Sequence, residues 1–531
     1  MTLRPGNPES CERTARVWIV VRTSTLDLTN SACNRICDGP SAGGPLSHAS
    51  RLRLFFLSLP LLGIVTSDAL AEVVFEDCRL AAPGTTLRSN ARCATYAVAE
   101  NPDEPAGRQI DLKVAVIPAR GKPVQSDAVL FLAGGPGQSA TESWPGIAHA
   151  FRSVRAHRDI LLVDQRGTGG SNSLTCPWSE ELELVDPDTL DLAALSRECL
   201  EQLDADTRFY TTTMAVQDLE AVRLALGYEQ LTLVGVSYGT RVALEYLRRY
   251  PESVRAVVLD GVVPPELALG GEHARNAQQA LDDAFARCVE NAVCHESFGD
   301  PAESFAELRQ ALSDGSIKVQ LRHPATGAAL ELPFNTLSLA AAIRLLSYQP
   351  EGVALIPLLL NDAVTTRDFS RVAAQALMTG ATLARSLSRG MELSVVCSED
   401  EPFFAPRESD QDTYLGHRFT AMITEQCEVW PRGAVPDDFH APVTSDTAVL
   451  LLSGQNDPVT PPRYGDQVAA TLSNARHVVA PGQGHNVIPR GCVPRVLAAF
   501  IETPDPDALD VACIDDLGPA PFFTTFTGPE P

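Results

Sequence analysis

The sequence contains no run of basic residues, and basic residues are few overall. Of its 531 residues, 42 are Lys or Arg and 67 are Asp or Glu, so the formal net charge is -25. A nucleic-acid partner requires clustered Lys and Arg to release counterions from phosphates, and we therefore expect no nucleic-acid partner. A solvated, mutually repelling surface explains the acidic excess.

The sequence also lacks an apolar run long enough to cross a membrane, which takes about 20 residues in a helix. The apolar segment LFFLSLPLLGIV at 54–65 is shorter than that; it follows two arginines and precedes Ala-Leu-Ala at 69–71. This order predicts a secretory signal peptide at 51–71 and a secreted or periplasmic protein without membrane attachment after signal removal. Since a signal peptide begins its protein, we expect residues 1–50 to be a non-native or disordered extension upstream of the true start.

Motifs for cofactors and metals are missing as well. Gly121-Lys122 lacks the rest of a phosphate-binding loop, and GTGGSN at 167–172 does not have the spacing of a dinucleotide-binding turn. The chain after residue 71 has no C-x-x-C or H-E-x-x-H pattern for a metal. We therefore expect neither a cofactor nor a metal.

Ten of the 13 cysteines follow residue 71, and an even number favours disulfides in an oxidising compartment. Ten cysteines allow about 945 pairings, and the sequence alone does not choose among them. We expect pairs between neighbours along the chain, each closing a short loop. The expected pairs are Cys78–Cys93, Cys176–Cys199, Cys288–Cys294, Cys397–Cys427 and Cys492–Cys513.

Short apolar runs alternate with helical patterns at both ends of the chain after residue 71. This alternation predicts an α/β fold, a mostly parallel sheet with helices on both faces. The expected strands lie at 112–119, 128–134, 159–165, 231–235, 254–261, 447–454 and 475–482, with a helix at 214–227.

Between these two parts, helix follows helix, which predicts an inserted helical cap. Residues 72–265 and 441–515 would then form the two parts of the core, on either side of a cap at 266–440. The proline-rich end, 516–531, is expected to be a loose tail.

Ser237 lies in the pattern G-x-S-x-G, formed by GVSYG at 235–239. The bare pattern recurs by chance, but here a strand precedes it and a helix follows it. A nucleophile elbow needs that context, because the sharp turn excludes bulky flanking residues and presents the serine oxygen at the start of a helix. Ser237 is therefore the predicted nucleophile.

A serine hydroxyl is a poor nucleophile, so it needs a base and an orienting acid, which follow in the order Ser, Asp, His in this fold. Asp457 comes just after one expected strand, and His485 just after the next. Loops at the carboxyl ends of parallel strands share one edge of the sheet. We predict that His485 accepts the serine proton, that Asp457 orients His485, and that activity falls as the pH drops through about 6–7.

The negative tetrahedral oxygen needs hydrogen-bond donors. AGGPG at 133–137 follows the second expected strand, and its glycines allow backbone N–H groups to face a substrate. The predicted oxyanion hole consists of the N–H groups of Gly135 and Tyr238.

These motifs resemble the α/β-hydrolase serine peptidases of the prolyl iminopeptidase and tripeptidyl aminopeptidase family, closer to the secreted tripeptidyl branch. The resemblance rests on FLAGGPGQS, ILLVDQRGTGGS, LVGVSYGTRVALEYLRRYP, VVLDGVVPP, LLSGQNDPVTPP and PGQGHNV. It implies a cap above Ser237, sequential disulfides, and a role for Asp164, Gln165 and Arg166 in bracing the oxyanion loop. The iminopeptidase branch has His where this chain has Ala133, which argues against proline specificity.

Substrate choice is expected to lie in the cap, where VVCSEDEPFF at 395–404 offers Glu399 and Asp400. A carboxylate can bind the ammonium group of a peptide N-terminus, although a solvated loop explains the same residues.

The leading hypothesis is a secreted serine aminopeptidase that acts on peptide N-termini through an acyl-enzyme on Ser237. A carboxylic ester hydrolase could use the same three residues, because the fold does not fix the leaving group. A non-catalytic binding protein on this fold remains a hypothesis of another class, although such a protein would need none of the three side chains. The sequence does not indicate the oligomeric state.

Overall fold

The computed structural model describes residues 73–529, apart from 177–188, 314, 316, 324–325 and 406. The predicted extension at 1–50 and signal peptide at 51–71 lie outside the described residues. No helix within the described ranges is long and apolar enough to cross a membrane.

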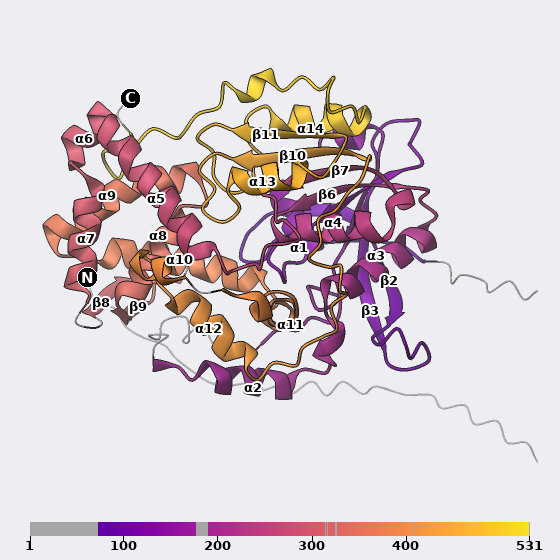
Figure 1. Ribbon diagram of the computed structural model, residues 1–531, viewed down its shortest axis with the longest axis horizontal. Helices are drawn as coiled ribbons and strands as arrows, with labels where there is room; N and C mark the ends of the chain where they lie inside the picture. Colours follow the sequence, from indigo (N-terminus) through magenta and orange to yellow (C-terminus); the bar gives the residue numbers. More distant parts are fainter. Residues whose placement is uncertain are drawn as a thin grey trace, which may run out of the picture. The chain divides into compact units, whose positions relative to one another are not determined.

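Nine of the described strands form one sheet in the order β1-β2-β3-β5-β4-β6-β7-β10-β11 (Figure 1). Neighbours from β5 to β11 are parallel, whereas the pairs among β1, β2, β3 and β5 are antiparallel. The sheet is therefore mostly parallel, as predicted, with an antiparallel edge of which only the strand at 112–119 was predicted. The strands are β1 Glu76–Ala81, β2 Arg88–Ala99, β3 Gln109–Ile117, β4 Ala128–Leu132, β5 Ile160–Val163, β6 Leu231–Val236, β7 Val254–Asp260, β10 Ala448–Gly454 and β11 Ala475–Ala480.

The central strands are buried on both faces, which is why they appear as nearly continuous apolar runs. Every residue of β4 is buried, and alternate residues point to opposite faces: Leu130 and Leu132 pack in one apolar cluster, Val129 and Phe131 in another. Helices α3, α4 and α13 contribute to the first cluster, α1 and α14 to the second. The helices of this part are α1 Ala140–Ile147, α2 Leu192–Gln202, α3 Thr212–Leu226, α4 Tyr238–Arg249, α13 Pro462–Ala469 and α14 Val493–Glu502.

The inserted segment, residues 261–447 between β7 and β10, is mainly helical and has its own apolar cluster. It also contains a hairpin, β8 Ile317–Arg322 with β9 Ala329–Phe334, where the sequence reading expected only helices. The alternation in IKVQLR marks the strand, because Val319 is buried between exposed Lys318 and Gln320. The helices are α5 His273–Glu290, α6 Ala292–Phe298, α7 Pro301–Ala311, α8 Thr336–Leu346, α9 Pro350–Thr366, α10 Ser370–Ser386, α11 Arg389–Glu399 and α12 Arg418–Cys427.

The structure contains all five expected disulfides between neighbouring cysteines. Cys78–Cys93 joins the paired strands β1 and β2, and the remaining four each tie two nearby segments together.

The C-terminal segment is not the loose tail that its prolines suggested. Phe522 is buried, and the guanidinium of Arg287 on α5 lies 4.0 Å from the centre of its ring. The backbone N–H of Phe523 donates to the carbonyl of Ala354 on α9 at 3.1 Å. An aromatic side chain and one backbone bond thus fasten this segment to the inserted helices.

Candidate active site

Ser237 lies in a tight turn between β6 and α4 with φ 56° and ψ -126°. A non-glycine residue rarely adopts this backbone conformation, which costs of order 1–3 kcal/mol and is common at functional turns. A Cβ at Gly235 would overlap the backbone of Gly239, and a Cβ at Gly239 would overlap the carbonyl of Leu132 on β4. Close packing therefore requires both glycines of the G-x-S-x-G pattern.

Asp457 and His485 meet at the carboxyl ends of the neighbouring parallel strands β10 and β11. His485 Nδ1 lies 2.7 Å from Asp457 Oδ2, and both side chains are buried. Asp457 Oδ1 also accepts the backbone N–H groups of Val459 and Thr460, each at 2.8 Å. These contacts fix the carboxylate so that it holds Nδ1 of the imidazole, leaving Nε2 as the nitrogen available for proton transfer.

The sequence reading did not include Thr460, although its hydroxyl contacts both members of this pair. Thr460 Oγ1 donates to Asp457 Oδ2 at 2.8 Å and lies 3.2 Å from His485 Nδ1. An Asp followed three residues later by Thr often forms a local turn in which the Asp side chain accepts backbone N–H groups. This spacing in the sequence could have indicated the contact between Asp457 and Thr460.

The inserted segment contacts His485 directly. The backbone N–H of His485 donates to the carbonyl of Tyr348 at 2.9 Å, and the two rings meet edge to face with their centres 5.3 Å apart. Tyr348 follows α8, so this helix end helps to position the imidazole.

Opposing influences act on the pKa of His485. Burial favours the neutral ring, but the charge of Asp457, its hydrogen bond and the charge of Asp260 outweigh burial and raise the pKa above the usual value. For Asp457, burial favours the protonated form, but His485 and the backbone donors lower the pKa below the usual value. The pair is therefore arranged to stabilise an imidazolium next to a carboxylate.

The predicted oxyanion loop lies against the nucleophile. A Cβ added at Gly134 would be 3.1 Å from the Cβ of Ser237, and Gly135 has φ 109°, which favours glycine. From the inserted segment, the N–H of Ser388 donates to the carbonyl of Gly137 at 2.9 Å. This loop and the N–H of Tyr238, the first residue of α4, are the predicted donors for a tetrahedral oxygen.

Asp164 braces the helix that follows this loop. Its carboxylate accepts the hydroxyl of Ser139 at 2.7 Å and the N–H of Thr141 at 2.8 Å, at the start of α1. Arg166 does something else: it pairs with Asp218 of α3 at 2.6 Å and donates to the carbonyl of Glu100 at 2.9 Å. Asp164 therefore has the expected contacts near the loop, whereas Arg166 contacts other parts of the core.

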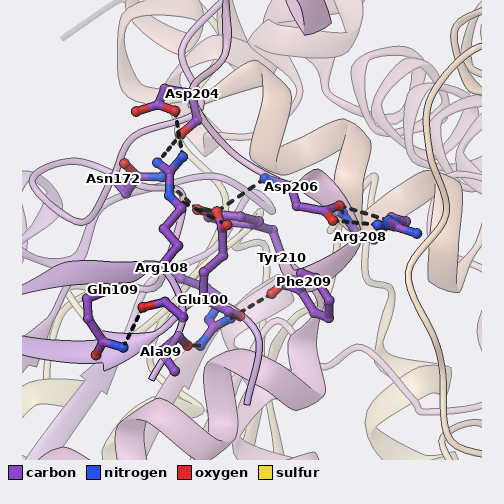
Figure 2. Close-up of polar contacts among 12 residues, drawn as sticks. Ala99, Glu100, Arg108, Gln109, Asn172, Asp204, Asp206, Arg208, Phe209 and Tyr210 are labelled. Carbon is purple, nitrogen blue, oxygen red and sulfur yellow. Dashed lines mark hydrogen bonds and ion pairs between the residues drawn. The ribbon is translucent and has the colours of Figure 1, made fainter. Parts of the chain in front are cut away.

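The region around Glu100 is a separate polar cluster at the end of β2. Figure 2 shows the Glu100 carboxylate accepting the Tyr210 hydroxyl at 2.8 Å and the N–H of Asp206 at 3.2 Å. Arg108 reaches the same carboxylate at 3.5 Å. These contacts link the end of β2 to the segment just before α3. Arg166 donates to the backbone carbonyl of the same Glu100, so it belongs to this structural cluster.

Asp260, at the end of β7, links the nucleophile to the histidine loop, and the sequence reading missed it. Its backbone carbonyl accepts the N–H of Ser237 at 2.8 Å. Its buried carboxylate accepts the N–H groups of Val487 at 2.9 Å and Ile488 at 2.8 Å, just after His485. Burial raises the pKa of Asp260 to about 6, while the two backbone donors and His485 favour the ionised form.

Glu399 and Asp400, predicted to bind a substrate ammonium group, are buried and occupied by other partners. Glu399 accepts the N–H and the hydroxyl of Thr212 at 2.6 and 2.7 Å, and Asp400 forms a fully buried ion pair with Arg241 of α4 at 2.7 Å. The prediction is therefore corrected: these carboxyl groups join α11 to the core. Their position next to Cys397 did not indicate that both carboxyl groups are buried, because the burial depends on contacts with α3 and α4.

No group of three or more His, Cys, Asp or Glu side chains in the described part of the chain could hold a metal ion.

Comparisons with known proteins agree with this fold. A model of the alpha/beta hydrolase fold matches residues 127–318, and a model of TAP-like proteins matches residues 412–513. This chain has the α/β-hydrolase fold and a segment similar to TAP-like proteins. Serine protease Hip1 of Mycobacterium tuberculosis (strain ATCC 25618 / H37Rv) is 26% identical over 466 residues, which cover 81% of this chain and 88% of Hip1.

Two further relatives match over shorter stretches. Tripeptidyl aminopeptidase of Streptomyces coelicolor is 30% identical over 215 residues, 37% of this α/β hydrolase and 39% of the relative. Carboxylesterase B of Mycobacterium tuberculosis (strain CDC 1551) is 30% identical over 240 residues, 41% of this chain and 46% of the relative. The match to the α/β-hydrolase model and these relatives identify the protein as a serine hydrolase.

The raised pKa of His485 predicts the acid limb of the pH profile. Because the neutral imidazole is the base, kcat/KM should fall as the pH drops through a midpoint above about 6.5. The measurement is kcat/KM for a small ester between pH 5 and 9. Asp457→Asn should lower both the rate and the midpoint, and a wild-type profile that stays flat down to pH 5.5 would contradict the assignment.

Asp260→Asn should lower kcat/KM by about 10- to 100-fold while the protein stays folded. Asparagine offers one acceptor oxygen and turns an N–H₂ toward a backbone donor, and losing a charged hydrogen bond costs about 1.5–3 kcal/mol. Steady-state kinetics and a melting curve would be recorded beside Asp77→Asn, an exposed control on β1. Activity within twofold of wild type would show that Asp260 does not position the histidine loop.

The adjacent carboxyls Glu399 and Asp400 should respond differently at pH 7. Asp400→Asn leaves the Arg241 guanidinium buried without its carboxylate and should cost about 3–5 kcal/mol of unfolding free energy. Burial and the charge of Asp400 raise the pKa of Glu399 to about 8, so Glu399 is mostly protonated and Glu399→Gln is nearly isosteric. We expect that variant to lose less than about 1 kcal/mol in urea unfolding.

The pH dependence of the unfolding free energy supplies the control for the Glu399 and Asp400 variants. Stabilisation linked to protonation of Glu399 is present below the unfolded pKa and is lost as the pH rises towards 8. Glu399→Gln should therefore gain stability relative to wild type between pH 5 and pH 8. A constant difference, or a large loss at pH 7, would show that Glu399 is ionised in the folded protein.

Proposed function

We propose that this serine hydrolase is a secreted aminopeptidase that releases residues or short peptides from peptide N-termini. The observation that carries the proposal is the buried hydrogen bond between Asp457 and His485, at the sheet edge where the strained turn presents Ser237. The resemblance to a serine protease over 81% of the chain, and to a tripeptidyl aminopeptidase over a shorter stretch, supports peptides as substrates.

In the proposed reaction, His485 Nε2 takes the proton of the Ser237 hydroxyl as the oxygen attacks the substrate carbonyl. Asp457 holds Nδ1–H and stabilises the imidazolium, and the N–H groups of Gly135 and Tyr238 stabilise the negative oxygen. His485 then protonates the leaving amine. Water, activated by the same imidazole, hydrolyses the acyl-enzyme and frees Ser237.

Export is part of the proposal. Five disulfides among the described residues suit an oxidising compartment, and the segment at 51–71 has the pattern of a signal peptide. The group that binds the substrate ammonium is not assigned, since Glu399 and Asp400 serve the packing of α11.

Ester hydrolysis is the second candidate, and the similarity to a carboxylesterase over 41% of the chain favours it. The same nucleophile, base and acid would serve, and only the leaving group would differ. A non-catalytic binding protein is the least favoured, because it would not need the strained serine turn or the buried carboxylate-imidazole pair.

A fluorophosphonate probe and three substrates separate these functions. The probe should label Ser237 of the protein purified after export by the host cell, and it should not label the Ser237→Ala variant. We expect a tripeptide anilide with a free amine to be cleaved at least tenfold faster than its N-acetylated form and faster than p-nitrophenyl acetate. Turnover of the ester alone would favour the esterase, and absence of labelling in folded protein would exclude the enzyme mechanism.

A further inference from the structure

A cavity of about 280 Å³ lies beside the nucleophile turn. Its walls come from segments far apart in the sequence: Phe131 on β4, Gln138 and Ile147 at the two ends of the α1 region, Val236 on β6, Gln349 before α9, and Asn486 after β11. It is separate from the polar cluster around Glu100.

Four of the lining residues adjoin groups that the proposed reaction uses. Val236 directly precedes Ser237, and Asn486 directly follows His485. Gly134, which also lines the cavity, faces both the Cβ of Ser237 and Oε1 of Gln138. Gln349 follows Tyr348, whose carbonyl accepts the N–H of His485. The cavity therefore lies next to the turn that carries Ser237 and to the loop that carries His485.

The chemistry of the walls is uncharged throughout. None of the lining residues is ionisable; Phe131, Ile147 and Val236 supply apolar surface, and Gln138, Gln349 and Asn486 supply carboxamides. Arg490 donates a hydrogen bond to Oε1 of Gln349, which helps to hold that side chain. An unpaired charge entering such a site loses hydration without gaining a partner, so neutral groups are favoured.

The size and position indicate which part of a substrate fits. Pockets for whole drug-sized ligands are roughly 300–1,000 Å³, so this cavity lies near the small end of that range and has room for one large side chain. His485 must deliver a proton to the leaving group, which therefore lies on the side of the histidine loop. Asn486 and Pro489 of that loop both line the cavity.

We propose that this cavity binds the side chain of the residue on the carboxyl side of the cut and selects an uncharged one. The proposal rests on the proposed peptidase function and deepens it. It assigns selectivity for the leaving group to a site between α1 and the histidine loop.

Helix α1 provides the test. Gly146 lines the cavity, and a Cβ added there meets no atom within 4 Å, so Gly146→Leu adds bulk at a position with room for the start of a side chain. Ser143, one turn earlier on the same helix face, also lines the cavity, and Ser143→Leu gives an independent second variant. Gly380→Leu is the matched control, because Gly380 lies in α10 and also has open space around its Cβ.

The assay varies only the residue after the cut, as Gly, Leu, Phe, Asp or Lys, in a peptide that the full-length protein cleaves. Wild type should favour Leu and Phe over Asp and Lys by at least tenfold in kcat/KM. Gly146→Leu and Ser143→Leu should lower the preference for Phe over Gly at least tenfold, and Gly380→Leu should not. Labelling by a fluorophosphonate, whose leaving group is fluoride, reports whether Ser237 is still reactive in the two α1 variants, and Gly380→Leu should label at the wild-type rate.

Three results would overturn the proposal: equal cleavage before charged and neutral residues, an unchanged Phe-to-Gly preference in both α1 variants, or a shift that follows the residue before the cut. If no peptide is cleaved but acetate esters are, the peptidase function fails separately. The cavity is then tested with methyl, butyl and benzyl acetates. An unchanged benzyl-to-methyl ratio in both α1 variants would overturn the leaving-group site as well.

Discussion

The turn at Ser237 depends on how closely α4 crosses the neighbouring strand β4. With any side chain at Gly239, the helix would collide with the carbonyl of Leu132, so the helix start, β6 and β4 can approach only through glycine. This approach brings the loop after β4 against the serine, with Gly134 next to its Cβ. The packing of two fully buried strands offsets the backbone strain at Ser237: β6, which leads into the turn, and β4, which pairs with β6.

Buried carboxylates then hold the other loops of the site in register with that turn. Asp260 accepts backbone donors from the histidine loop while its own carbonyl accepts from Ser237, and Asp457 accepts donors from its own turn as well as from His485. A buried carboxylate is costly unless its lone pairs are used, and here nearly all the partners are backbone N–H groups or hydroxyls. Asp260 and Asp457 thus hold the loops of the site in place, and their charges also raise the pKa of His485.

Much of the fold was predictable, because apolar runs and helical periodicity are local signals. All seven expected strands are present in the sheet, and Asp457 and His485 meet as strand order requires. The antiparallel edge β1-β2-β3 was partly missed because β2 has a mixed burial pattern, and the hairpin β8-β9 because it is short and surrounded by helices. Periodicity identifies strands well only where one or both faces are consistently buried.

The residues that sequence reasoning missed or misjudged share a different property, which is that their roles depend on distant contacts. Asp260 looks like the end of a strand, yet its partners lie more than 200 positions later. Glu399 and Asp400 looked like charges on a loop, yet they are buried against α3 and α4. Tertiary packing determines whether such a charged side chain is exposed, and the local sequence around these residues does not indicate it.

The inserted segment contacts the predicted base and the proposed binding cavity at the same place. Tyr348 holds the backbone of His485, and the next residue, Gln349, lines the cavity beside it. Ser388, also in the inserted segment, donates its N–H to the carbonyl of Gly137 in the predicted oxyanion loop. Because Tyr348 and Gln349 are adjacent in the chain, a substitution that moves the backbone at Gln349 would also move the carbonyl that accepts the N–H of His485. The inserted segment thus links the wall of the proposed cavity to the position of the predicted base.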